Sequence, residues 1–183
     1  KIHEISSARG ASMLIQKKVF DELGGFDEKF FATFEDVDLG WRSWISGYKT
    51  VLVPKSIVYH MGGQTVNVFK NEIAFHGFKN QLSMKITNSE SKLIFKVLSQ
   101  FFLKYGIREL KIWFDYKING TTKITPTKYE NKRADKPDFK IILKSIIWIF
   151  KNSSYLRKKH NKVNQNRKIS TKSLTEMNIL IKQ

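Results

Sequence analysis

The sequence predicts an α/β unit at its start, followed by amphipathic α-helices. Short β-branched runs alternate with short helical patterns up to His60, as in α/β architectures. Beyond residue 70 the apolar residues recur at helical spacing instead. Hydrophobic residues make up 41% of the 183 residues, which is enough for a packed core and excludes a wholly disordered chain.

The first 60 residues predict a small set of alternating elements. In chain order they are a strand at 9–16, a helix at 17–23, an aromatic loop at 26–34, a helix at 36–46, and a strand at 48–53 that residues 57–60 continue. Gly24-Gly25 and Gly47 follow the two helices directly, as terminating glycines do, and Pro54 closes the β-branched run. Two or three strands are too few for a stable open sheet, so we expect the rest of the sheet to precede this chain.

The second part predicts helices of unequal character. They are expected at 71–86, 92–118 and 139–150, with a polar loop at 119–138 and a last short helix that Ser170 or Ser173 caps. In residues 92–118 the polar positions form one narrow stripe, so this helix is either buried or lies in a membrane interface. Residues 139–150 are too short to span a bilayer, which takes about 20 residues.

The net charge of +17 is confined to this second part. Residues 1–60 carry eight basic and eight acidic residues, whereas residues 61–183 carry 25 basic and eight acidic ones. The basic part therefore predicts a polyanionic partner, either a nucleic acid or an anionic membrane surface. The absence of cysteine excludes disulfides, thiolate metal sites and cysteine nucleophiles.

The densest group of reactive side chains lies where the aromatic loop meets the second helix. Glu35, Asp36 and Asp38 follow four phenylalanines in residues 26–34. Carboxylates are expected there for structural reasons alone, because free N–H groups and the positive helix end stabilise them. An apolar wall beside a carboxylate raises its basicity, however, and suits general-base chemistry. On these grounds Asp36 is either a helix cap or a base.

A series of short motifs carries a family resemblance. In order they are Gly10-Ala11-Ser12-Met13-Leu14-Ile15, Gly24-Gly25-Phe26-Asp27-Glu28, Phe34-Glu35-Asp36-Val37-Asp38-Leu39, Gly47-Tyr48, Val53-Pro54 and Val58-Tyr59-His60. This pattern resembles the C-terminal half of the family 2 glycosyltransferases, above all their rhamnosyltransferase-like members. Weaker similarity continues at Lys79-Asn80 and in residues 148–170. The resemblance implies a GT-A type α/β fold and sugar transfer with inversion, from a nucleotide-sugar donor to a glycan or lipid-linked acceptor.

The resemblance also implies catalytic and metal-binding roles for individual residues. Asp36 would be the base that deprotonates the acceptor hydroxyl, and Glu35 would shape the acceptor site. His60 would join a divalent metal ion, Mn²⁺ or Mg²⁺, that bridges the donor diphosphate; an imidazole suits such an ion when oxygen atoms complete the shell. Considered without the resemblance, His60 is an ordinary hydrogen-bonded histidine.

Three further residues belong to the implied acceptor and phosphate-binding surface. Asp38 would begin the helix, Arg42 would reach a phosphate, and Gly10 would give the backbone its shape. For Arg42 the alternative is a solvated position on the helix.

The resemblance also suggests how the chain is divided. In the family, an Asp-x-Asp motif and the nucleotide-binding strands precede this region, and residues 1–9 contain no such pair. We therefore expect residues 1–70 to be the acceptor and base half of the catalytic domain, 71–152 a membrane-surface extension and 153–183 a basic tail. On this expectation either the chain is a truncated product or the donor-binding half lies upstream in a longer protein, and the chain alone is inactive.

Three interpretations of the basic part compete. In the first, the enzyme is cytoplasmic and peripheral on the inner face of the cell membrane, with its basic side chains against anionic headgroups. In the second, the tail is a nucleic-acid-binding module, but residues 156–183 contain no aromatic side chain on which bases could stack, which makes nucleic acid the weaker candidate. In the third, a solvated basic tail follows a packed helical pair. For the function of the whole chain, a non-catalytic fragment that binds a membrane surface is a further alternative.

Overall fold

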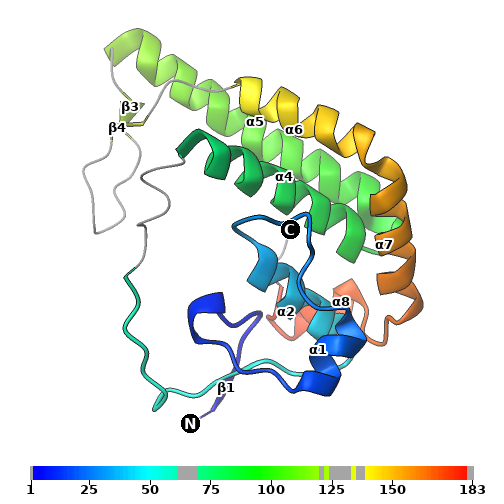
Figure 1. The fold of residues 1–183 in the computed structure, drawn as a ribbon. Coiled ribbons are helices and arrows are strands. Elements are labelled where there is room, and N and C mark those ends of the chain that lie inside the picture. Colours follow the sequence, from blue (N-terminus) through cyan, green and yellow to red (C-terminus); the bar gives the residue numbers. More distant parts are fainter. Residues whose placement is uncertain (1, 62–69, 120–121, 124–132, 135–138, 181–183) are drawn as a thin grey trace.

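The computed structural model describes residues 2–61, 70–119, 122–123, 133–134 and 139–180, and most of them are helical (Figure 1). The helices are α1 (Lys17–Leu23), α2 (Glu35–Ile45), α4 (Lys70–Asn88), α5 (Ile94–Asn119), α6 (Phe139–Lys151), α7 (Ser153–Gln165) and α8 (Thr171–Glu176), with 3₁₀ turns at Gly10–Ser12 and Ser91–Leu93. The strands are β1 (His3–Glu4), β2 (Val51–Leu52), β3 (Thr122–Lys123) and β4 (Arg133–Ala134).

The helices form close to their predicted bounds. Those expected at 17–23, 36–46, 71–86, 92–118 and 139–150 are α1, α2, α4, α5 and α6. Gly24 has φ +79° at the end of α1, and Gly47 has φ +86° just beyond α2, a left-handed conformation that glycine adopts without strain. Ser170 caps α8 by accepting a hydrogen bond from the backbone N–H of Ser173 (3.1 Å).

The expected β-structure is only partly present in the described residues. β1 pairs with β2 in antiparallel register, with His3 opposite Leu52 and Glu4 opposite Val51. The strand predicted at 9–16 is wrong: Gly10–Ser12 form a 3₁₀ turn, and the described chain offers no strand beside it to satisfy its backbone groups. Residues 57–60 form no ladder either. The GT-A fold therefore stays a prediction.

The loop expected at 119–138 lies mostly outside the described residues. Its described part contains the antiparallel pair β3–β4, in which Thr122 lies opposite Ala134 and Lys123 opposite Arg133.

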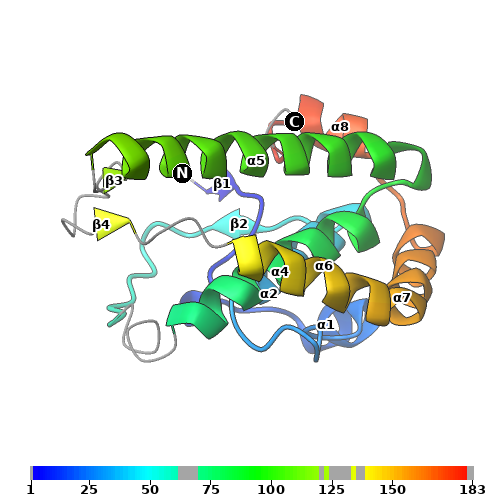
Figure 2. The same ribbon diagram turned by 90° about the horizontal axis from the view of Figure 1, so that it is seen from above.

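Helix α4 is the centre of the helical part. It contacts α2, α5, α6 and α7. In Figure 1, α2 lies on one side of α4 and both α5 and α6 lie on the other, while α7 runs down beside its C-terminal end. In the view from above, α6 crosses in front of α4, which it contacts (Figure 2). Phe78 and Leu82 of α4 form one buried cluster with Phe101 of α5. Trp44 of α2 packs with Leu174 of α8 in a second cluster. In agreement with this cluster, Figure 1 shows α8 beside α2.

Residues 153–180 belong to the segment 153–183 that was expected to be a basic tail. They bury an apolar face and expose basic side chains. Leu156 and Leu174 are buried at 3% and 0% exposure. The backbone N–H groups of Lys168 and Ile169 both donate to the carbonyl of Ile45, at 2.8 and 3.1 Å. This segment therefore packs directly against the end of α2.

Helix α5 carries apolar side chains both on its buried side and on its exposed side. Val97 and Phe101 are 6% and 4% exposed, whereas Phe95, Leu103 and Ile118 are 85%, 66% and 65% exposed. Among the described helices, none combines the length and the apolar character that crossing a membrane requires.

If α8 is part of the folded core, truncating its buried leucine must destabilise the whole chain. Leu174→Ala leaves a cavity beside Trp44, and we expect it to lower the free energy of unfolding by about 2–5 kcal/mol in urea titrations. Met177→Ala, which truncates a neighbouring side chain that is 44% exposed, should cost about 1 kcal/mol or less. Equal and small losses for the two variants would show that α8 is detached.

Candidate functional site

A strained turn begins the helix that carries the predicted base. Thr33 and Phe34 both have φ +66°, in the left-handed region that bulky residues rarely adopt. Two such residues in succession persist only where their surroundings hold them, and they are frequent at functional sites. Here the side-chain amide of Asn80 donates to the carbonyls of Ala32 (2.7 Å) and Thr33 (2.8 Å). Helix α4 therefore determines where α2 starts.

Lys79 holds the same loop from the next position of α4. Its ammonium group donates to the carbonyl of Lys29 and lies 4.4 Å from the ring centroid of Trp148. The side chain is almost wholly buried, and this burial lowers the pKa of Lys79 to about 8, an effect that Lys29 adds to and Asp27 opposes. A buried cation in this position anchors the loop but has no direct access to solvent.

The turn places Asp36 and Glu35 in the first turn of α2. One carboxylate oxygen of Asp36 accepts the backbone N–H of Gly10 (3.0 Å), and the other accepts that of Val37 (2.8 Å). The structure thus brings together Gly10, Glu35 and Asp36, three of the residues predicted from the sequence. Both oxygens of Asp36 keep lone pairs for a further donor, and the side chain is only half-buried.

Glu35 contains an unsatisfied oxygen. Its Oε2 atom is shielded from solvent and accepts no hydrogen bond from the described residues. The hydroxyl of Thr33 is likewise shielded and has no partner among them. A buried polar group without a partner costs about 1–3 kcal/mol. Such a group beside Asp36 suggests that a donor from a bound molecule completes the site.

Asp38 and Arg42 lie on the buried side of α2. Asp38 is fully buried and accepts from Arg42 Nε (2.9 Å), from the Asn88 amide (2.9 Å) and from Lys159 Nζ (3.1 Å). Arg42 also donates to the carbonyls of Leu23 (2.7 Å) and Gly25 (2.9 Å). These bonds tie the end of α1 to α2, so Arg42 has a structural role in addition to any contact with a phosphate, which stays a prediction.

The aromatic loop joins this network through Asp27. Its carboxylate accepts from Lys159 Nζ (2.5 Å), the Tyr155 hydroxyl (2.6 Å) and the Lys29 backbone N–H (2.9 Å). Burial alone would raise the pKa of Asp27, but the charge of Lys159 and the three hydrogen bonds outweigh it and lower the pKa. Burial and the bond to Asp27 raise the pKa of Tyr155, so its hydroxyl stays protonated.

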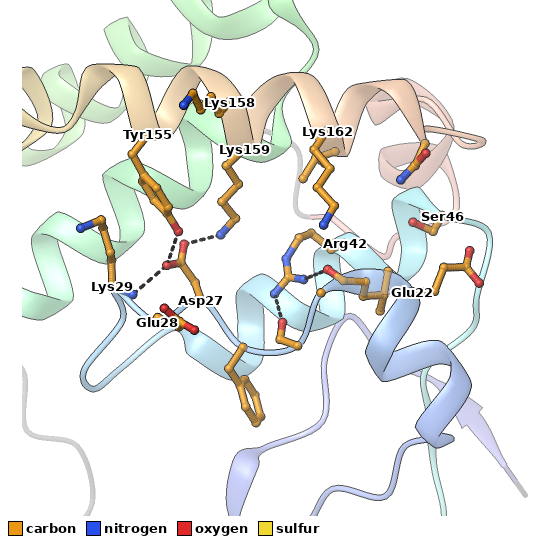
Figure 3. Close-up of a pocket in the computed structure, with 16 residues that line it drawn as sticks. Glu22, Asp27, Glu28, Lys29, Arg42, Ser46, Tyr155, Lys158, Lys159 and Lys162 are labelled. Atoms are coloured by element: carbon orange, nitrogen blue, oxygen red, sulfur yellow. Dashed lines mark hydrogen bonds and ion pairs between the residues drawn. The ribbon is translucent and has the colours of Figure 1, made fainter.

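A cavity of about 600 Å³ opens beside this network, between the end of α1, the start of the loop and α7 (Figure 3). In the close-up, Lys159 points toward Asp27, and Lys162 reaches toward Arg42 from the same helix. Acidic and basic side chains both line the cavity, so its charge does not favour one sign strongly. Neither Glu35 nor Asp36 lies on its wall.

His60 lies apart from these groups. It is exposed in the segment after β2 and makes no hydrogen bond or ion pair with another described residue. In the described ranges, no three His, Cys, Asp or Glu side chains gather as metal ligands. The described part of the chain does not by itself fit a Mn²⁺ or Mg²⁺ ion, and we derive no step through a metal.

The sequence reasoning missed the contribution of α7. Tyr155, Lys159 and Val163 recur four residues apart, and Leu156 and His160 do the same. This spacing is the signal of a helix with one buried face, although basic residues surround it. The three-part division of the chain stays a prediction, but the described residues of the last part supply a lysine and a tyrosine to the network at the candidate site.

A segment of the chain is similar to known enzymes. Over 51 residues it is 43% identical to the N-acetylglucosaminyl-diphospho-decaprenol L-rhamnosyltransferase of two Mycobacterium tuberculosis strains, CDC 1551 / Oshkosh and ATCC 25618 / H37Rv. The match covers 28% of this chain and 17% of each relative, so it spans only a small part of those proteins. No protein-family model matches the chain, and no solved structure matches it significantly. The similarity indicates a glycosyltransferase-like relationship for this segment.

The lowered pKa of Asp27 predicts a dependence of stability on pH. Its ion pair stabilises the fold fully above pH 3.8, the ordinary pKa, and the contribution is lost as the pH falls through the lower pKa of the folded state. At pH 7, Asp27→Asn leaves Lys159 with Asp38 as its remaining buried carboxylate partner, and we expect the free energy of unfolding to fall by about 1–3 kcal/mol. Below the folded-state pKa the difference between variant and wild type should shrink.

The matched control is Asp21→Asn, because Asp21 pairs with Lys17 on the exposed surface of α1. It should cost about 0–1 kcal/mol at either pH. Urea unfolding at pH 7 and pH 3 measures both variants. If the loss of unfolding free energy caused by Asp27→Asn is the same at both pH values, the ion pair of Asp27 with Lys159 is not the source of the loss.

Proposed function

We propose that this chain contributes the acceptor and base half of an inverting family 2 glycosyltransferase of GT-A type. The observation that carries the proposal is the geometry of Asp36. A strained, doubly anchored turn presents this carboxylate half-exposed at the start of α2, beside a buried oxygen of Glu35 that lacks a partner. The similarity of a segment of the chain to a rhamnosyltransferase supports the same reaction class. A nucleotide-sugar would be the donor.

In the proposed reaction, Asp36 acts as a general base. The acceptor hydroxyl donates a hydrogen bond to a free lone pair of the carboxylate, which the N–H groups of Gly10 and Val37 hold in a fixed orientation. Asp36 takes the proton as the acceptor oxygen attacks the anomeric carbon. The bond from that carbon to the diphosphate breaks on the opposite side, and the nucleoside diphosphate leaves with the electron pair. The anomeric configuration is therefore inverted.

Glu35 has the properties of an acceptor-binding group in this scheme. Its unpaired Oε2 would accept a hydrogen bond from a second hydroxyl of the acceptor and remove the cost of leaving it unsatisfied. Sugars present adjacent hydroxyl groups, so one molecule could reach both Glu35 and Asp36. This arrangement would favour a glycan or a glycan linked to a lipid.

Replacing the base should abolish transfer without disturbing the turn. Asp36→Asn keeps the shape of the side chain, and its one remaining oxygen can still accept the N–H of Gly10 or that of Val37, but it cannot take a proton. In the natural protein that carries this chain, we expect sugar transfer to fall about 100-fold or more. Transfer of labelled L-rhamnose and of other sugars from their nucleotide donors to extracted membrane lipids measures the effect.

Donor binding by the same variant and the activity of Asp21→Asn serve as controls, because both should be unchanged. Turnover close to that of the wild type would refute the role of Asp36.

We also propose that the α5–α6 layer binds an anionic membrane surface, which would make the enzyme peripheral on the inner face of the membrane. Leu103, Ile107, Leu110 and Phe114 follow one another at helical spacing along α5, and all are at least 45% exposed. An apolar stripe of this kind, on a chain with a net charge of +17, is typical of a surface that lies in a membrane interface. The donor would then meet a lipid-linked acceptor at that surface.

Two substitutions on the stripe should weaken this binding. Leu103→Ser with Leu110→Ser removes apolar contact, and we expect binding to anionic liposomes to fall about tenfold or more in cosedimentation. The control pair is Leu14→Ser with Ile57→Ser, which are 100% and 72% exposed elsewhere. Equal losses for the two pairs would contradict the proposal, as would tight, salt-sensitive binding to RNA with no binding to liposomes.

A further inference from the structure

A second cavity has a different chemistry from the one in Figure 3. It measures about 550 Å³ and lies between α2, α4 and α5, with residues from both ends of the described chain at its edge. Its described wall contains no acidic residue, whereas Lys85, Lys104 and Arg108 all line it. The cavity therefore has a single sign of charge, which favours an anionic occupant.

The positive charges of this cavity are poorly compensated. Neither Lys85 nor Lys104 makes an ion pair or hydrogen bond with another residue in the described parts of the chain. Burial and the charge of Lys104 both lower the pKa of Lys85, as expected where two ammonium groups crowd together. Arg108 forms a long ion pair, with 3.7 Å between its Nε and Glu109 Oε1. Its guanidinium carbon lies 5.6 Å from the centroid of the Tyr105 ring. A bound anion would relieve the repulsion between the lysines.

The rest of the wall combines apolar side chains with several polar ones, and two of its polar atoms have no partner among the described residues. Trp41 and Phe101 line the cavity at 5% and 4% exposure, and Val97 lies beside them at 6%. The indole N–H of Trp41 has no acceptor, and Oε1 of Gln100 has no donor, among the described residues. Trp41 is more than nine-tenths buried, so its indole N–H is an unsatisfied buried donor at the wall of this cavity.

We propose that this cavity binds an anionic amphiphile, with a phosphate group among Lys85, Lys104 and Arg108 and an alkyl chain over Trp41 and Phe101. Guanidinium and ammonium groups are the usual partners of phosphate. Because part of the wall is apolar, a ligand that also has an apolar chain fits the cavity better than a purely ionic one. The volume lies within the range of ordinary small-molecule sites. Val37, which directly follows Asp36 in α2, lines the same cavity, whereas Asp36 itself does not.

Equilibrium binding of a soluble probe tests the site without any transfer reaction. Monododecyl phosphate, kept below its micelle-forming concentration, is titrated into the chain by calorimetry, alongside uncharged dodecyl maltoside and inorganic phosphate. We expect the phosphate amphiphile to bind at least about tenfold more tightly than either of the others. Lys104→Gln with Arg108→Gln should weaken its binding about tenfold or more, since both side chains contribute to the same head group.

The control pair removes the same charge from the same helix. Lys96 and Lys111 are exposed on α5 and do not line the cavity, so Lys96→Gln with Lys111→Gln should change binding less than about twofold. All four substituted side chains are exposed or at the rim, and circular dichroism checks that each variant is folded. Equal weakening by the two pairs would overturn the site in favour of general charge attraction.

Two other outcomes also overturn the proposal. If inorganic phosphate binds as tightly as the amphiphile, the cavity takes a free anion, and if dodecyl maltoside does so, the cavity takes an apolar chain alone. Asp36→Asn should leave the binding of monododecyl phosphate unchanged. A failure of the catalytic proposal is therefore distinguishable from a failure of this one.

Discussion

The contact on which the rest of this structure depends is the pair of bonds from Lys159 to Asp27 and Asp38. One ammonium group on α7 joins the aromatic loop to the buried side of α2, across more than 120 residues of chain. Detaching α7 would leave two carboxylates in a poorly hydrated site, with Arg42 as the only guanidinium beside Asp38 among the described residues. The basic C-terminal segment thus supplies a counter-charge to two buried carboxylates of the N-terminal part.

The same dependence reaches the candidate site through α4. His160 of α7 lies 3.0 Å from the carbonyl of Ile86, and the amide of Asn164 donates to that of Ser89 (3.2 Å), which fixes the C-terminal end of α4. Further along α4, Asn80 holds the left-handed turn from which Asp36 projects. A strained turn needs such external support, because two residues in the left-handed region cost about 1–3 kcal/mol each. The rigidity of the site therefore comes from helices far from it in sequence.

Whether the sequence could predict a feature depends on how far apart in the chain the interacting residues lie. Helices α1 and α2 were predictable because apolar spacing and a following glycine are local signals, and these helices end where Gly24 and Gly47 adopt positive φ. The strand expected at 9–16 was wrong because an apolar run becomes a strand only where another strand lies beside it. The hydrogen bond from Gly10 to Asp36 and the link from Asp27 to Lys159 had no local signal, since partners that lie far apart in the chain leave no pattern in one sequence.

The distribution of positive charge gives the net charge of +17 a more specific meaning. Lys159 and Lys79 lie inside the fold, where a carboxylate pair and a carbonyl satisfy them, so they contribute little to attracting a partner. Lys85 and Lys104 differ because they face a cavity without an acid on its described wall. Long-range attraction to an anionic surface is screened within about 8–10 Å in salt, whereas an unpaired charge in a partly buried cavity is screened much less. On the proposed function of this cavity, the lysines that select the ligand are Lys85, which is half-buried, and Lys104 at the rim. The other surface lysines contribute only a general attraction to anionic partners.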